Sequence, residues 1–113
     1  MSAPVHSGLA AGRWRSLTLV EQLAHVGSEV ERTLRARDQS LTERYNRAAD
    51  RALELFDLTA ADDRWAGARR REILRAREYF CRVCFGDDAE ADAPAYLRRY
   101  FLQFATAARA RGR

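Results

Sequence analysis

Apolar residues recur at every third or fourth position in four separate segments of the sequence, the spacing that aligns them along one face of an α-helix. Only 2 prolines and 6 glycines interrupt the 113 residues, which favours long helices over many short strands. Four amphipathic helices with short connections pack most economically when neighbours run in opposite directions. We therefore predict an all-α fold, an up-down antiparallel four-helix bundle. The helices are expected over residues 17–37, 41–59, 68–85 and 92–109.

The chain length suits a single domain that buries one core without disulfides or a metal ion. We expect the bundle to occupy residues 16–110, with Ser16 as the N-cap of the first helix. Residues 1–15 are rich in small side chains and lack a helical period, so they are expected to form a flexible tail. Residues 111–113 are expected to be a frayed C-terminus.

A glycine at the centre of the first apolar stripe predicts a close contact between helices. Gly27 stands where alanine would favour the helix by about 1 kcal/mol. The second predicted helix carries a face of small residues that would suit such a contact. That face contains Ala48, Ala49 and Ala52.

Four short stretches, one in each predicted helix, give a further indication of the fold. They are GSEVER, RALELFDLT, RAREYF and YFLQFATAAR. Together they resemble a set of small, uncharacterised bacterial all-helical proteins, and the resemblance spans roughly residues 19–109. It implies the same number of helices, and it implies no activity, cofactor or site residue.

The only two cysteines, Cys81 and Cys84, form a C-x-x-C motif in the third predicted helix. A zinc site needs about four ligands, but His6 lies in the predicted tail and His25 in the first helix. A thioredoxin-like site would need a preceding strand and a βαβ context. Cysteine is among the most buried residue types, so we interpret both cysteines as core residues and predict no metal site.

Catalytic groups are not arranged in the sequence as the common chemistries require. A di-iron carboxylate bundle needs Glu-x-x-His motifs, whereas Glu21 and His25 are four positions apart and lie away from the first apolar stripe. The sequence contains no recognisable nucleophile–base arrangement and no glycine-rich phosphate loop. We therefore expect no enzymatic activity, no catalytic residue and no cofactor.

Three charged residues, Glu31, Arg70 and Arg77, fall on otherwise apolar helix faces. An unpaired buried charge costs several kcal/mol. These side chains are therefore expected to reach solvent at the rim, to form a partly buried pair of Glu31 with Arg70 or Arg77, or to line a ligand pocket.

Arginine supplies every basic side chain, because the chain has no lysine, and the formal net charge is +4. A GC-rich genome would explain this preference, and so would selection for bidentate contacts with phosphate or carboxylate. The positive charge is concentrated in residues 69–82 and 95–113, which would attract nucleic acid, although the acidic loop at 86–94 offsets part of it. The segments of the first two helices are near neutral. The candidate nucleic-acid-binding residues are Arg71, Arg75, Arg82, Arg98 and Arg99.

The apolar surface of the second predicted helix is wider than one stripe, as in a helix that contacts two neighbours or a partner. We therefore expect a non-enzymatic binding or assembly module whose partner is a protein, either a second copy or the product of a neighbouring gene. The alternative is an accessory nucleic-acid-binding protein that uses arginines of the third and fourth helices. No apolar run reaches the length of a membrane span, so no membrane partner is expected and a cytoplasmic location is the default.

Overall fold

The computed structural model describes residues 12–86 and 92–111, which form α-helices and one short 3-10 helix and contain no strand. The all-α prediction is therefore confirmed for the described residues. The predictions for residues 1–11, for the loop acids at 87–91 and for residues 112–113 lie outside them. The elements are α1 (Gly12–Arg15), α2 (Leu19–Asp38), α3 (Thr42–Ala60), η1 (Asp63–Trp65), α4 (Ala68–Phe85) and α5 (Ala93–Arg111).

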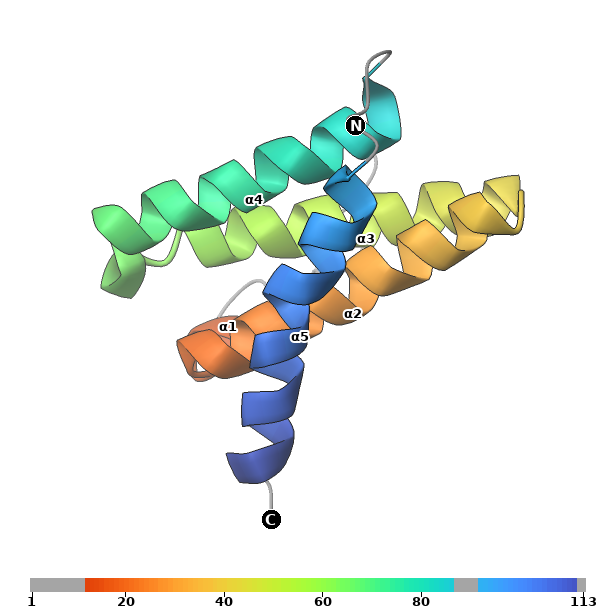
Figure 1. Cartoon of the computed structure of the whole chain (residues 1–113). Helices are drawn as coiled ribbons and strands as arrows, with labels where there is room; N and C mark the ends of the chain where they lie inside the picture. The colour runs from red at the N-terminus through yellow and green to blue at the C-terminus, as the bar shows by residue number, and fades with distance from the viewer. Residues whose placement is uncertain (1–11, 87–91, 112–113) are drawn as a thin grey trace.

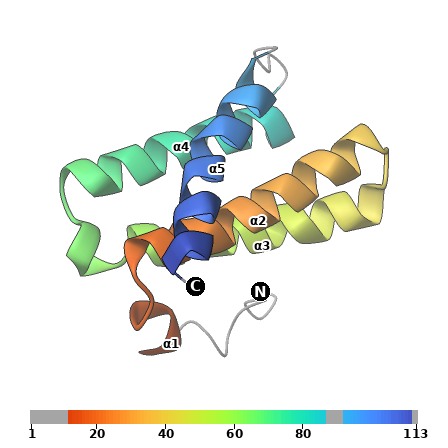
Figure 2. The ribbon, with the colours of Figure 1, turned by 60° about the horizontal axis from the view of Figure 1, so that its bottom comes forward.

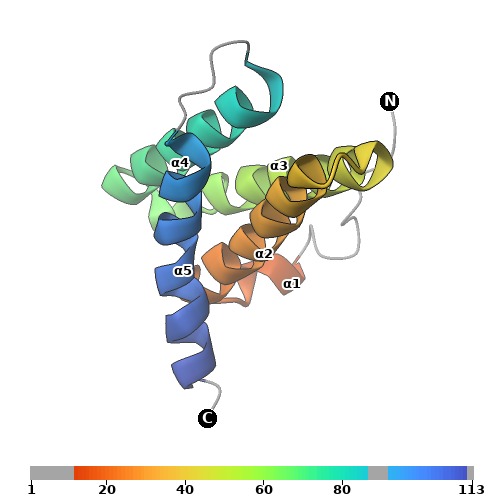
Figure 3. The same cartoon turned by 45° about the vertical axis from the view of Figure 1, so that its right-hand side comes forward.

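Three long helices, α2, α3 and α4, lie antiparallel in one layer, and the fourth, α5, crosses it. Figure 1 shows α2 and α3 lying antiparallel, with α4 returning beside α3, whereas α5 crosses this layer steeply. Figure 2 shows the same crossing from below, and Figure 3 shows the last turns of α5 extending past α2. The predicted up-down bundle, in which all four helices run nearly along one axis, does not describe α5.

An aromatic cluster fills the centre of the molecule. The rings of Phe56 on α3 and Phe80 on α4 lie 5.7 Å apart, and that of Phe101 on α5 lies 5.8 Å from Phe56. All three side chains are buried. They join three helices that are separated in the sequence, and the contacts supply the tilted and edge-on ring geometries that aromatic pairs favour.

Gly27 explains where α5 crosses α2. A Cβ atom at Gly27 would lie 2.7 Å from the Cβ of Phe101, closer than two carbon atoms can approach. The glycine therefore permits a close helix contact, as predicted. The predicted neighbour is wrong, because the nearest atoms belong to Phe101 and not to the alanine face of α3.

The segment before α2 is packed and not free. Residues 12–15 form α1, and the side chain of Trp14 is only 2% exposed, so the predicted flexible tail is wrong for these four residues. The first long helix also begins later than expected, at Leu19. Thr18 is its N-cap and forms a reciprocal capping box with Glu21, which satisfies two backbone N–H groups.

A polar network at this end of the molecule connects α1, α2 and η1. The buried amide of Gln22 donates to the carbonyl oxygen of Trp14 at 2.9 Å and to the carboxylate of Asp62 at 3.1 Å. Its own oxygen accepts from Trp65 Nε1 at 2.8 Å. The Arg64 guanidinium, 2.7 Å from Asp62, holds the pKa of that carboxyl well below its usual range. The indole N–H of Trp14 is buried without a partner among the described residues.

None of the helices within residues 12–86 and 92–111 combines the length and the apolar character that crossing a membrane requires.

Candidate functional site

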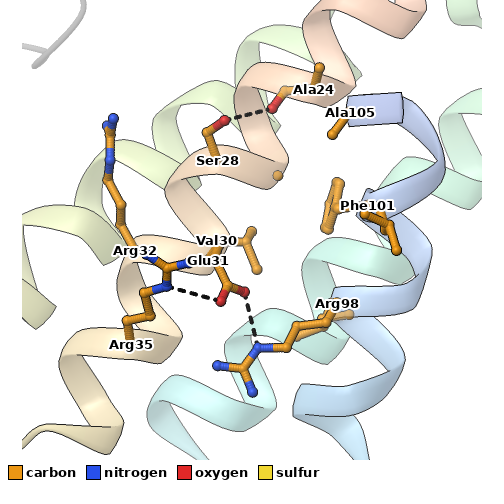
Figure 4. A pocket seen from close by; sticks show the side chains of 12 residues that line it. Ala24, Ser28, Val30, Glu31, Arg32, Arg35, Arg98, Phe101 and Ala105 are labelled. Carbon is orange, nitrogen blue, oxygen red and sulfur yellow. Dashed lines mark hydrogen bonds and ion pairs between the residues drawn. The ribbon is translucent and has the colours of Figure 1, made fainter. Parts of the chain in front are cut away.

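A groove of about 500 Å³ lies where α5 crosses α2. Figure 4 shows Phe101 and Ala105 of α5 facing Ala24 and Val30 of α2, with charged side chains at one end of the groove. The groove has an apolar floor and a basic end. Its lining residues are Ala24, Gly27, Ser28, Val30, Glu31, Arg32, Arg35, Leu97, Arg98, Phe101, Leu102 and Ala105.

Small residues on both helices create the space in this groove. Ala24 and Gly27 recur along one face of α2, and Ala105 follows Phe101 by one turn of α5. Leu102 stands at the edge of the groove and is 59% exposed. Leu102 and the apolar floor beside it together form an exposed hydrophobic surface, and such surfaces often bind a partner.

Glu31 organises the charged end of the groove. Its carboxylate accepts a hydrogen bond from Arg98 Nε at 3.0 Å and one from Arg35 Nε at 3.3 Å, as the dashed lines in Figure 4 show. Arg98 also donates to Asp38 at 3.3 Å. The Glu31 carboxylate beside it raises the pKa of the Arg98 guanidinium. These pairs hold the guanidinium groups of Arg35 and Arg98 at the rim of the groove.

A pair of Glu31 with Arg70 or Arg77, one of the three expected alternatives, does not form, because Glu31 accepts from Arg98 and Arg35. Arg70 donates to the carbonyl oxygen of Ala60 at 2.7 Å, and Arg77 donates to Asp57 at 2.9 Å. Both arginines bind groups at the α3–α4 side, since α4 lies beside α3 and not beside α2. The steep crossing of α5 brings Arg98 to Glu31 instead.

A buried carboxylate on α2, Glu29, was not predicted. Its side chain is 9% exposed and accepts from Arg32 at 2.7 Å and from Arg51 of α3 at 3.1 Å. The sequence contained one usable signal, because Arg32 follows Glu29 by three positions on a helix. The bond to Arg51 depends on how α2 and α3 are aligned, which helical periodicity alone does not determine.

The five predicted nucleic-acid-binding arginines have different environments. Arg71 and Arg75 on α4 and Arg99 on α5 are exposed and make no ion pair with another described residue. Arg82 donates to Glu78 at 2.8 Å, and Arg98 belongs to the groove. Of the five, only Arg71, Arg75 and Arg99 therefore have guanidinium groups that are not paired with another described residue.

The two cysteines are half-buried free thiols on α4. Cys84 packs against the core, and its carbonyl oxygen accepts a hydrogen bond from the Tyr45 hydroxyl at 2.9 Å. Burial raises the pKa of the Cys84 thiol and raises that of Tyr45 to about 12. A thiol with a raised pKa stays protonated at neutral pH, so it is a poor nucleophile and a poor metal ligand. No three His, Cys, Asp or Glu side chains within the described ranges are grouped to hold a metal ion.

Comparison with known proteins finds no matching family model, no matching curated protein and no matching solved structure. A functional assignment for this chain therefore depends on its own residues.

Proposed function

We propose that this chain is a non-enzymatic binding module that holds an amphipathic, acidic segment of another protein in the α2–α5 groove. The observation that carries this proposal is the combination of an apolar floor with an arginine-lined end in one groove. Apolar side chains of the partner would occupy the floor beside Phe101, and its acidic side chains would meet Arg32 and Arg35. This is the way in which an amphipathic helix commonly binds a hydrophobic groove.

Charge argues for a different protein and against a second copy as the partner. Residues 93–111, which form α5, contain no acidic residue, and the whole chain carries a formal net charge of +4. A second α5 would bring arginines against an arginine-lined end, and like charges disfavour such contacts. The absence of a recognised arrangement of catalytic groups in the sequence is why we propose binding and not catalysis.

The test uses a labelled helical peptide with leucines on one face and glutamates on the flanking positions, measured by fluorescence anisotropy. We expect wild type to bind it and a glutamate-to-lysine version of the peptide to bind far more weakly. Leu102→Glu should weaken binding by about tenfold or more, because burying a leucine contributes about 1.5–3 kcal/mol. Leu74→Glu is the matched control, since Leu74 is an exposed leucine of α4, 45% exposed and outside the groove.

Two results would contradict the proposal. One is equal affinity for the acidic and basic peptides. The other is an equal loss in the Leu102 and Leu74 variants, which would mean that the peptide binds exposed apolar side chains without using the groove.

A second candidate function is nucleic-acid binding by α4. Its support is that Arg71 and Arg75 are exposed, four positions apart and without an ion pair among the described residues. Contacts of this kind bind phosphates and do not distinguish bases, so affinity for mixed-sequence RNA should fall steeply with salt. A titration of Arg71→Gln/Arg75→Gln beside wild type at low salt tests it, and unchanged affinity would remove this candidate.

A further inference from the structure

A second cavity, of about 380 Å³, lies between the C-terminal half of α2 and the N-terminal half of α3. Among the residues that the structure describes, nine line it: five are arginines, and none is acidic or aromatic. We call it the arginine pocket. Its lining residues are Arg32, Arg35, Ala36, Gln39, Leu41, Arg44, Arg47, Ala48 and Arg51.

Helical spacing on two antiparallel helices produces this pocket. Arg44, Arg47 and Arg51 follow one another by three and four positions, so they share one face of α3. Between the arginine rows lie Ala36 and Ala48, which are both buried. The short alanine side chains leave depth where longer residues would fill the space between the helices.

The arginines of the pocket differ in how far they are neutralised. Glu29 pairs with Arg32 and Arg51, and it is buried and does not line the pocket. Neither Arg44 nor Arg47 makes an ion pair or hydrogen bond with another described residue. Both are exposed, so their five guanidinium donors each are available to a ligand.

We propose that the arginine pocket binds an anion with several adjacent phosphate groups, supplied either as a free oligophosphate or along a nucleic-acid backbone. A terminal phosphate group offers three acceptor oxygens and about two negative charges, and each diester of a nucleic-acid backbone offers two free oxygens and one charge. Several adjacent groups can therefore accept from several guanidinium groups at once. One carboxylate, with two oxygens and one charge, is satisfied by a single arginine. The cavity volume lies within the range of small-ligand pockets, and without an aromatic side chain no base is held by stacking.

Arg32 and Arg35 line both the arginine pocket and the proposed groove. The test therefore uses Arg44 and Arg47, which line the arginine pocket and not the groove. Arg44→Gln/Arg47→Gln removes two exposed charges of α3. Arg13→Gln/Arg15→Gln removes two exposed charges of α1 that line neither cavity, and it is the matched control.

Inorganic triphosphate and a mixed-sequence single-stranded oligonucleotide are titrated separately into wild type and both variants by calorimetry, at near-physiological salt. At least one of the two probes should bind wild type. The α3 variant should lose at least about tenfold in affinity for that probe, because it removes charge-assisted hydrogen bonds from two guanidinium groups. The affinity of the α1 control for the same probe should stay within about twofold of wild type. Binding of triphosphate identifies a free oligophosphate as the source, and binding of the oligonucleotide alone identifies the nucleic-acid backbone.

Three outcomes would overturn the proposal. The first is that wild type binds neither probe, and the second is an equal loss of affinity in both variants, as expected for diffuse attraction to a basic protein. The third is a larger loss in the α1 variant, which would place the phosphate contacts outside the arginine pocket. Circular dichroism of both variants establishes that each remains folded, and the exposure of all four side chains makes this the expected result.

Discussion

Both ends of the α2–α3 hairpin carry charged side chains, which are hydrogen-bonded inside the fold at one end and exposed to solvent at the other. Where α1, α2 and η1 meet, the Asp62 carboxylate accepts from Arg64 and from Gln22, and Gln22 in turn accepts from Trp65. At the other end, Arg44 and Arg47 face solvent without a partner among the described residues.

The difference separates charges that stabilise the fold from charges that remain available for a ligand. A carboxylate as buried as Asp62, which is 4% exposed, requires compensating hydrogen bonds in the folded state. An exposed guanidinium keeps its water and requires none. The first end should therefore respond to mutation with a loss of stability, and the second with a loss of binding at nearly constant stability.

The largest effect is expected at Asp62. Asp62→Ala leaves the Gln22 amide without one acceptor inside the molecule, so we expect the free energy of unfolding to fall by about 2–3 kcal/mol. Urea unfolding followed by circular dichroism measures it. The control is Asp63→Ala at the neighbouring position. The Asp63 side chain is 98% exposed, so its removal should cost less than about 0.5 kcal/mol. Equal losses in the two variants would show that the buried network stabilises the fold no more than an exposed aspartate does.

Glu29 should respond less strongly, because Arg32 can turn to solvent when the carboxylate is removed. We expect Glu29→Gln to lower the free energy of unfolding by about 1–2 kcal/mol, through the weakened contact with the half-buried Arg51. The same change removes a negative charge beneath the arginine pocket, so the affinity for triphosphate should rise. Weaker triphosphate binding in a folded Glu29→Gln variant would mean that Glu29 positions the arginines more than it neutralises them.

Acid should reduce the contribution of the Asp62 network. The pKa of Asp62 is lowered in the folded protein, so its stabilisation is fully present above the usual aspartate pKa of about 3.9 and is lost as the pH falls below it. We expect the stability difference between wild type and Asp62→Asn to be constant near neutral pH and to narrow below about pH 4. Unfolding experiments across this range measure the difference. If the stability difference between wild type and Asp62→Asn instead narrowed toward alkaline pH, Asp62 would not be the group responsible.

The smallest effect on stability is expected at the arginine pocket. Arg44→Gln/Arg47→Gln should change the free energy of unfolding by no more than about 0.5 kcal/mol, because neither side chain pairs with another residue that the structure describes. Relief of repulsion between the arginines acts in the stabilising direction. A loss as large as that of Asp62→Ala, in the same urea unfolding experiment, would remove the contrast between the two ends of the hairpin.

Local sequence signals predicted the long helices well and their arrangement poorly. The helix over 68–85 has the predicted bounds, because apolar periodicity and flanking glycines mark both of its ends. The helix at 12–15 was missed, since the burial of Trp14 depends on contacts with distant residues and leaves no periodic pattern. The crossing of α5 was also missed. It depends on which residue occupies the space at Gly27, and an alanine face on another helix was an equally good partner by composition.

The arginine pocket escaped prediction for a different reason. The segments of α2 and α3 are near neutral as a whole, so summing charges along the sequence points to α4 and α5. In the folded chain, Glu29 turns inward while Arg44 and Arg47 turn outward, and the two helices bring their arginines to one cavity. A charge sum over each helix face, and not over each segment, would have indicated the basic surface of α3.

The contact between Gly27 and Phe101 has a consequence for how this protein can vary during evolution. Any side chain at position 27 would overlap the Phe101 side chain. A larger residue should therefore be tolerated at position 27 only after Phe101 has been replaced by a smaller residue. Positions 27 and 101 should therefore change together among descendants of this sequence, with glycine accompanying an aromatic residue and a larger residue accompanying a small one. A pair of positions that covaries in this way would carry, in the sequences alone, the geometry of the helix crossing that periodicity does not specify.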